Sequence, residues 1–146
     1  MKYKGMFALT RPLADLMVDN WPDWAEPIDL VLPVPLHPKR ERERGYNQAM
    51  LLVKRICSRL ELEGDGASLW RNRYTRPQVG LNPRERLDNV RDAFAAERDR
   101  VKHKHILLVD DVYTTGATLT AAADTLLANG ARAVSGYCLA RAAGHS

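Results

Sequence analysis

The chain of 146 residues has only two cysteines, Cys57 and Cys138. Two cysteines this far apart argue against a disulfide framework and a zinc site, so we expect each to be a small buried apolar residue. No apolar run approaches the ~20 residues of a membrane span, and the amino terminus lacks the apolar core of a signal peptide. These absences favour a cytoplasmic protein without a membrane span.

The sequence also has no G-x-x-x-x-G-K-[ST] segment, which argues against a nucleotide triphosphatase of the P-loop class. "ILLVDD" resembles the Walker B strand of such enzymes, and a receiver domain also ends a strand in an acid. A receiver domain does not need the threonine- and glycine-rich loop that follows here. Both classes are therefore minor alternatives. His37, His103 and His105 lack metal-ligand spacing, and we expect His103 and His105 to be solvated surface residues.

The charge balance is mildly basic, with 22 Lys and Arg against 18 Asp and Glu and a net charge of +4. The basic residues gather in three stretches, 37–45, 71–77 and 98–105. This balance permits an anionic partner such as a nucleotide, a phosphosugar or nucleic acid without requiring one. The length fits a single domain over residues 1–146.

Helical and strand patterns alternate along the chain. Apolar spacing predicts helices over 6–21, 46–60, 82–94 and 116–130. Apolar runs predict strands over 28–35, 67–73, 105–111 and 132–141. The polar stretch 73–82 predicts a mobile loop. This alternation is typical of an α/β fold with a mainly parallel sheet flanked by helices.

A candidate phosphate site follows the apolar run 106–109. In an open α/β sheet, ligands bind beyond the carboxyl ends of the strands, and Asp110 and Asp111 should lie at that edge. The turn after them leads into a helix whose first amide groups are unpaired and whose dipole end is positive. Its amides and hydroxyls could enclose a phosphate monoester. The residues that contribute them are Thr114, Thr115, Gly116, Ala117 and Thr118.

The two carboxylates next to this loop would repel a phosphate, so they need a different target. Carboxylates accept hydrogen bonds from vicinal hydroxyls and bind Mg²⁺. Ribose 5-phosphate suits both the phosphate loop and the carboxylates, because its phosphate and its 2- and 3-hydroxyls lie at opposite ends of the molecule. We therefore expect a sugar phosphate held at both ends, with Asp110 and Asp111 near Mg²⁺, directly or indirectly.

The stretch "ILLVDDVYTTGAT" resembles the phosphoribosyl-pyrophosphate motif of the type I phosphoribosyltransferases. Three further blocks, "DLVLPVPLHPKRERERGYNQA", "RPQVGLNPRERLDNVRDAF" and the terminal "LAR", resemble the competence protein F branch of that superfamily. Together these blocks extend from about Ile28 to Arg141. That branch commonly carries a four-cysteine zinc ribbon ahead of the transferase-like domain. We expect this chain to lack the ribbon, and whether another protein supplies it stays open.

The resemblance implies a type I phosphoribosyltransferase-like fold with a flexible hood loop, and binding of phosphoribosyl pyrophosphate with Mg²⁺. It implies that Arg44, near the departing pyrophosphate, acts in catalysis with Asp110 and Asp111. It also implies further substrate-binding residues in two places, the end of the loop after the first strand and the hood. These residues are Asn47, Gln48, Gln78, Arg84, Arg86 and Asn89.

The resemblance leaves the acceptor and the catalytic competence open. Purine-salvage relatives have an aspartate where this chain has Thr114, and a hydroxyl cannot accept a proton at neutral pH as a carboxylate can. This argues against hypoxanthine–guanine salvage. The alternative function is DNA uptake, with single-stranded DNA and competence proteins as partners and the phosphoribosyl site in a regulatory or nucleotide-end-binding role. The oligomeric state is also open, with a homodimer as one alternative.

Overall fold

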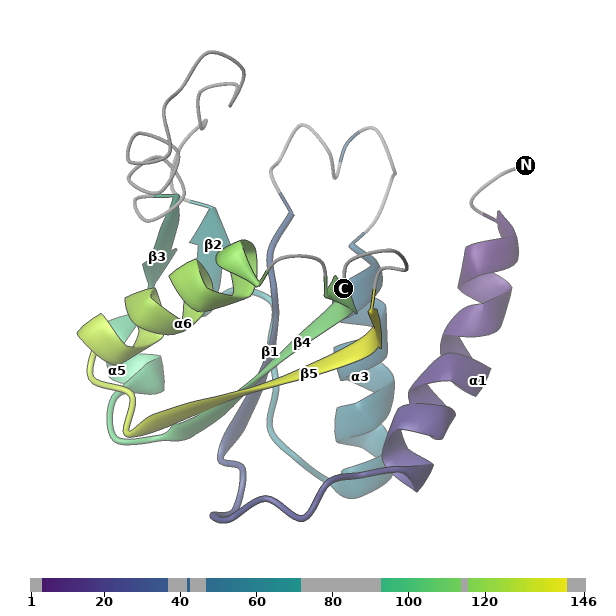
Figure 1. Cartoon of the computed structure of the whole chain (residues 1–146), viewed down its shortest axis with the longest axis horizontal. Helices are drawn as coiled ribbons and strands as arrows, with labels where there is room; N and C mark the ends of the chain where they lie inside the picture. Colours follow the sequence, from purple (N-terminus) through teal and green to yellow (C-terminus); the bar gives the residue numbers. More distant parts are fainter. Residues whose placement is uncertain (1–3, 37–41, 43–46, 72–92, 114–115, 142–146) are drawn as a thin grey trace.

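A parallel three-stranded sheet forms the centre of the protein (Figure 1). The computed structural model describes residues 4–36, 42, 47–71, 93–113 and 116–141. The strands β1 (Leu30–Pro33), β4 (His105–Tyr113) and β5 (Ala133–Arg141) lie in the order β1-β4-β5. The first two strands are buried on both faces over 30–33 and 105–109, as is usual where helices cover both sides of a parallel sheet. The predicted α/β class is confirmed.

Two helices cover one face of the sheet. They are α1 (Lys4–Asp19) and α3 (Gln48–Leu60), which contact each other, and α3 also contacts β1 and β4. Leu52, Val53 and Ile56 form one apolar side of α3 and are at most 1% exposed. They share a core cluster with Val31 and Leu107 of the sheet. The apolar spacing that predicted these helices therefore marks their buried faces.

The opposite face is covered by α6 (Ala117–Ala128) and by a two-stranded ribbon. The ribbon pairs β2 (Leu69–Arg71) with β3 (Phe94–Ala96) in antiparallel orientation, and the short helix α5 (Arg98–Val101) follows it. The apolar side chains of the ribbon and of α6 share one core cluster with every second residue of β1 and β4.

One predicted helix ends differently from expectation. The pattern over 82–94 predicts a helix as far as Phe94, but Phe94 is the first residue of β3 and is 6% exposed. The prediction is wrong at this end because Ala93 and Phe94 are buried in the core formed with β2, which local periodicity does not reveal. Residues 82–92 lie outside the described part of the chain, as does the whole of the predicted loop 73–82.

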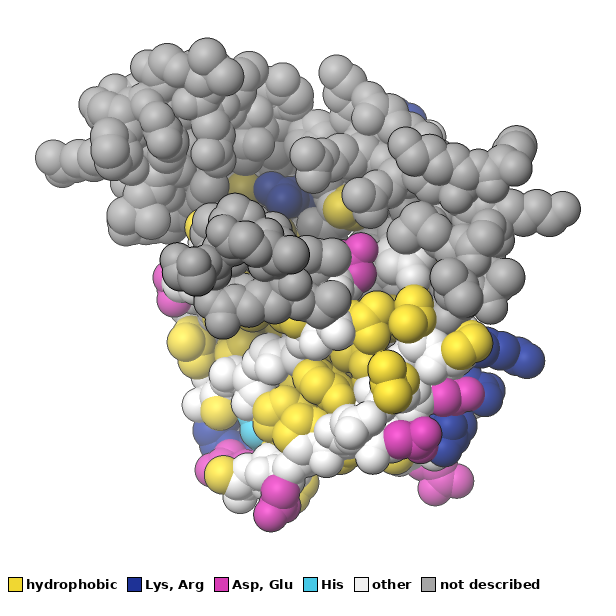
Figure 2. Space-filling model, turned by 45° about the vertical axis from the view of Figure 1, so that its right-hand side comes forward, with side chains coloured by type: hydrophobic (Ala, Val, Ile, Leu, Met, Phe, Trp, Pro, Cys, Tyr) yellow, Lys and Arg dark blue, Asp and Glu magenta, His cyan; other side chains and the backbone are white. Residues whose placement is uncertain are grey.

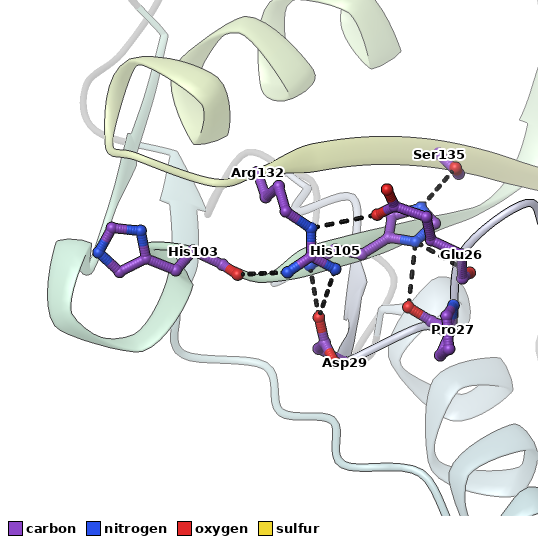
Figure 3. Close-up of polar contacts among 7 residues, drawn as sticks. All are labelled: Glu26, Pro27, Asp29, His103, His105, Arg132 and Ser135. Atoms are coloured by element: carbon purple, nitrogen blue, oxygen red, sulfur yellow. Dashed lines mark hydrogen bonds and ion pairs between the residues drawn. The ribbon is translucent and has the colours of Figure 1, made fainter.

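His105 also contradicts its prediction. It was expected at the surface because lysines precede it, yet it is 4% exposed at the start of β4. Its Nδ1 lies 3.2 Å from the carbonyl oxygen of Glu26 and 3.1 Å from that of Pro27, and its Nε2 lies 2.8 Å from Ser135 Oγ (Figure 3). Since carbonyls only accept, Nδ1 carries a proton. The ring joins the connection between α1 and β1 to the edge strand β5.

Ion pairs surround this histidine at the amino edge of the sheet. Arg132 Nε donates to Glu26 at 3.1 Å, and its Nη2 donates to Asp29 at 3.3 Å (Figure 3). The same Asp29 carboxylate accepts a hydrogen bond from the backbone N–H of His105 at 2.8 Å. We define Glu26, Asp29, His105, Arg132 and Ser135 as the amino-edge network. It fixes the segment that enters β1.

Both cysteines are free thiols that are half-buried rather than fully buried. Trp21 and Trp24 are packing residues, because they make edge-to-face contacts with each other and with Tyr137. None of the described helices combines the length and the apolar composition that crossing a membrane requires.

Candidate functional site

The acid pair lies where β1 has ended and β4 continues. Pro33, the last residue of β1, is opposite Val109, so the next residues of β4, Asp110 and Asp111, have no β1 partner in the ladder. The predicted strand 105–111 ends with these two acids, and β4 extends two residues further, to Tyr113, and pairs Asp110 with Cys138 of β5. The carboxylates are therefore held on a strand at the carboxyl edge, which is a more rigid support than a loop.

Burial and mutual repulsion dominate the electrostatics of this pair. Burial raises the pKa of Asp110 to about 7, and the neighbouring Asp111 carboxylate is the second cause. The backbone N–H of Asp111, which donates to Asp110 Oδ1 at 2.8 Å, and the charge of Arg71 lower the pKa and oppose this rise in part. Two close carboxylates in a partly buried site favour one shared proton or a bound cation.

The amino terminus of α6 follows β4 directly. Gly116 is the N-cap residue, with φ of 82°, a left-handed conformation that suits glycine, and no side chain caps the helix there. Thr120 donates the first intrahelical bond to the Gly116 carbonyl at 2.8 Å. Ala117 and Thr118 begin the helix, as predicted, while Thr114 and Thr115 lie outside the described residues. The described part of the turn thus places a positive helix end next to the acids.

A second helix begins at the same edge. Asn47 is the N-cap of α3, where its Oδ1 accepts a hydrogen bond from Ala49 N at 3.0 Å. Its Nδ2 donates to the Val34 carbonyl at 3.4 Å. Gln48 is 3% exposed within the first turn. The structure therefore gives Asn47 a defined role as a helix cap, and the predicted substrate-binding role of both residues stays a prediction.

The remaining predicted site residues fall outside the described part of the chain. They are Arg44, Gln78, Arg84, Arg86 and Asn89, together with the two threonines of the phosphate turn. Among the residues that the structure does describe, the acid pair, the start of α6 and the start of α3 lie at the same edge of the sheet.

Arg71 is a charged residue at this edge that the sequence analysis did not single out. It ends β2, and its Nε donates to the carbonyl of Pro35 at 3.3 Å. Its positive charge acts on Asp110. Figure 2 shows a basic and an acidic group in the upper part of the molecule, separated in this view by grey and hydrophobic atoms. The only sequence signal was membership of the basic stretch 71–77.

The donor chemistry of the site fits Mg²⁺ in part. Among the described residues, no group of three or more His, Cys, Asp or Glu side chains converges as a complete metal cage. Mg²⁺ commonly uses one or two carboxylates and takes its other ligands from water and phosphate oxygens. Asp110 and Asp111 supply that number of carboxylates, and a cation would relieve the repulsion that raises the pKa of Asp110.

Comparison with protein families matches residues 51–145 to the phosphoribosyl transferase domain. The chain is 40% identical over 113 residues to the DNA utilization protein YhgH of Escherichia coli, covering 77% of this chain and 49% of that protein. It is 32% identical over 148 residues to competence protein F of Haemophilus influenzae, covering 97% of this chain and 65% of that protein. The chain thus spans about half to two thirds of the length of these relatives, and the predicted resemblance is confirmed.

Solved structures support the fold. The glutamine phosphoribosylpyrophosphate amidotransferase of B. subtilis matches with a TM-score of 0.61 at 19% identity, over 89% of this chain and 26% of that one. The adenine phosphoribosyltransferase of Thermoanaerobacter pseudethanolicus matches with a TM-score of 0.56 at 14% identity, over 89% of this chain and 66% of that one. At these identities the likeness concerns the fold alone, and it confirms the predicted type I phosphoribosyltransferase-like architecture.

Proposed function

Because the chain belongs to the phosphoribosyl transferase domain family, we propose that it binds 5-phosphoribosyl 1-pyrophosphate together with Mg²⁺ and transfers the pentosyl group to an acceptor. The observation that carries this proposal is the position of Asp110 and Asp111 on β4, next to the positive end of α6. One ligand with a phosphate, a diol and a pyrophosphate matches that arrangement. The 5-phosphate would lie at the turn before α6, with the ribose hydroxyls facing the acids.

The chemistry of the transfer needs charge stabilisation at two positions. The bond between C1 and the pyrophosphate oxygen breaks as the acceptor bonds to C1, so positive charge develops on the ribose ring and negative charge on the leaving group. The two carboxylates are placed to stabilise the ring charge electrostatically. When bound by Asp110 and Asp111, Mg²⁺ would neutralise part of the charge on the pyrophosphate.

Isothermal titration of the wild-type chain with phosphoribosyl pyrophosphate, with and without Mg²⁺, tests this proposal. We expect Mg²⁺-dependent binding that Asp110→Asn combined with Asp111→Asn weakens at least about tenfold, because two charged ligand contacts are lost. Asp99→Asn is a matched control, since Asp99 is exposed in α5 at the amino edge. Wild-type protein that binds neither phosphoribosyl pyrophosphate nor ribose 5-phosphate would overturn the proposal.

A second function is suggested by the printed names of the relatives, which refer to DNA utilization and competence. Single-stranded DNA would bind through basic residues, with the phosphoribosyl site in a regulatory or nucleotide-end-binding role. Such binding should weaken steeply between 50 and 200 mM salt, because each phosphate contact releases counterions. Fluorescence anisotropy with a labelled oligonucleotide measures this slope, and an affinity that does not change with salt contradicts it. The two functions are compatible.

A further inference from the structure

The outermost strand of the parallel sheet, β5, has an unpaired side. It pairs with β4 on one side, and no described strand lies on the other. Every second residue of such a strand turns its N–H and C=O groups outward. Among the described residues, no other segment bonds to the backbone of 134–139. An outer strand of this kind is a template on which a further strand can pair.

The sequence of β5 has few of the features that usually prevent such pairing. The strand is nine residues long, and its residues 133–140 include no charged side chain and no proline. Gly136, near the middle of the strand, is exposed. Proteins commonly protect an outer strand by keeping it short or by placing lysine or proline on it. The outer side of β5 therefore has the properties of a surface that pairs with another chain.

An apolar stripe on α6 extends this surface. Leu119, Ala123 and Leu127, which we call the α6 stripe, are spaced four residues apart and so lie along one side of the helix. Leu119 and Ala123 are half-buried against the core, and Leu127 is 47% exposed. A Cβ on Gly136 would lie 2.8 Å from Leu119 Cδ2, so the stripe is on the β5 side of α6. Figure 2 shows hydrophobic side chains gathered in the lower middle of the molecule.

The position of α6 favours a second copy of this chain as the partner. The helix contacts both β4 and β5 and therefore lies over the space between them. An antiparallel second copy of β5, at the usual strand spacing of about 4.8 Å, brings the two α6 helices to roughly 10 Å, a distance at which helices pack. The two-fold axis places both helices on the same face, so the two α6 stripes meet. A lone peptide strand would cover β5 but leave Leu127 exposed.

The charges at the two ends of β5 favour the same arrangement. Glu26 and Asp29 lie beside the start of the strand, with side chains 52% and 40% exposed, and both pair with Arg132. These three residues together carry a surplus negative charge. The strand ends in a basic residue, Arg141. An antiparallel second copy brings opposite charges together at both ends of the interface, whereas a parallel copy would bring like charges together.

We infer that two copies of this chain associate through β5 in antiparallel orientation, so that their sheets join into one and the α6 stripes pack together across the two-fold axis. The inference assigns an interface to the homodimer that the sequence leaves as one alternative. It does not depend on the proposed function, because the outer side of β5 and the α6 stripe lie apart from the acid pair on β4.

Sedimentation velocity of the full chain, from about 1 to 100 µM, tests this association. We expect wild type to dimerise, and Leu127→Lys to weaken the dimer at least about tenfold, because each copy then brings a charge into an apolar interface. Val134→Lys, on β5 itself, should have the same effect. Trp70→Lys is the matched control, since it places the same charge on an apolar residue that is 39% exposed in β2, outside the sheet that contains β5.

Hydrogen exchange at low and high protein concentration identifies the strand that pairs. The amides of 134–139 should exchange more slowly at high concentration in wild type and Trp70→Lys, and not in Leu127→Lys. Wild type that stays monomeric overturns the inference, as does a dimer that Leu127→Lys leaves intact or whose β5 amides gain no protection. Thermal unfolding of each variant shows whether the fold is kept, and the exposed position of Leu127 keeps the test valid if Val134→Lys does not fold.

Discussion

At the scale of single residues, the acid pair that we propose to bind substrate also lowers the stability of the fold at neutral pH. A carboxyl buried beside another carboxylate is easier to keep protonated, and the pKa of Asp110 rises from 3.8 to about 7 in the folded chain. A raised carboxyl pKa favours folding most below the unfolded value, and this contribution is lost as the pH rises through the folded value. The free protein is therefore destabilised by Asp110 at neutral pH.

The first prediction follows from this loss of stability as the pH rises. Asp110→Asn should be more stable than wild type by at least about 1 kcal/mol at pH 8, because the neutral amide removes the buried charge. At pH 4 the difference should be smaller, since wild type is then mostly protonated at this site. Urea unfolding at both pH values, each in the absence of Mg²⁺, measures it. A variant that is less stable than wild type at pH 8 contradicts the prediction.

The second prediction uses the cysteine opposite the acids. Burial raises the pKa of both Cys57 and Cys138 to about 11, but only Cys138 is also raised by the charges of Asp110 and Asp111. Replacing both acids by asparagine should therefore accelerate alkylation of Cys138 at pH 8 by about threefold to tenfold, since the thiolate reacts. Cys57 should not change. Peptide mass spectrometry after timed iodoacetamide treatment distinguishes the two thiols, and equal acceleration of both would point to loosening of the fold instead.

At the scale of elements, the start of α3 follows from its local sequence, whereas the chain just after its end depends on tertiary contacts. Asn47 caps its start, which the sequence can suggest. Its end has Glu61 in the left-handed region with φ of 54°, a position that glycine occupies at less cost. Shortly after, Gly64 runs close to the body of the protein, because an added Cβ would lie 2.6 Å from Cys57 Sγ and 2.8 Å from the Val31 carbonyl.

The third prediction concerns these two positions. Glu61→Gly should raise the free energy of unfolding by about 0.5 to 1 kcal/mol, because the left-handed backbone no longer carries a Cβ. Gly64→Ala should lower it by about 1 to 3 kcal/mol, because the methyl group overlaps atoms that cannot move freely. Urea unfolding of the two variants beside wild type is the measurement. Opposite signs are expected, and two destabilised variants would show that Glu61 makes contacts that outweigh its strain.

Much of this element pattern was predictable from the sequence, and the exceptions have a common cause. The helices α1, α3 and α6 were predicted because each repeats its apolar spacing over a long segment, and β4 because it contains a continuous apolar run. The elements β3 and α5 are too short to show a period, and Phe94 was assigned to a helix. The acid pair and Gly116 were found because they adjoin an apolar run, whereas Arg71 depends on pairing with Phe94, a contact between distant segments.

At the scale of the whole molecule, the two edges of the parallel sheet carry different groups of polar residues. The carboxyl edge carries the acids, Arg71 and the positive helix end. The amino edge carries the network around His105, in which both ring nitrogens have partners and the ring is 4% exposed. A buried polar network that is fully hydrogen-bonded fixes a single arrangement of the chain that enters β1.

The fourth prediction concerns stability at the amino edge, as distinct from ligand binding at the carboxyl edge. His105→Ala should lower the free energy of unfolding by about 1 to 3 kcal/mol, since it leaves buried partners unsatisfied. It should leave the affinity for phosphoribosyl pyrophosphate within about twofold, because the site is at the other edge. Arg132→Ala, a half-exposed ion-pair partner in the same network, should cost less than about 1 kcal/mol. Thermal unfolding and titration together test this, and a His105→Ala variant that folds but binds tenfold more weakly would contradict the separation.

The β2–β3 ribbon has a consequence for how this protein can diversify. Arg71 and Phe94 pair across the ribbon, so the two ends of segment 72–92 are adjacent in space. The number of residues between these two ends can therefore change among descendants while β2 and β3 keep their register.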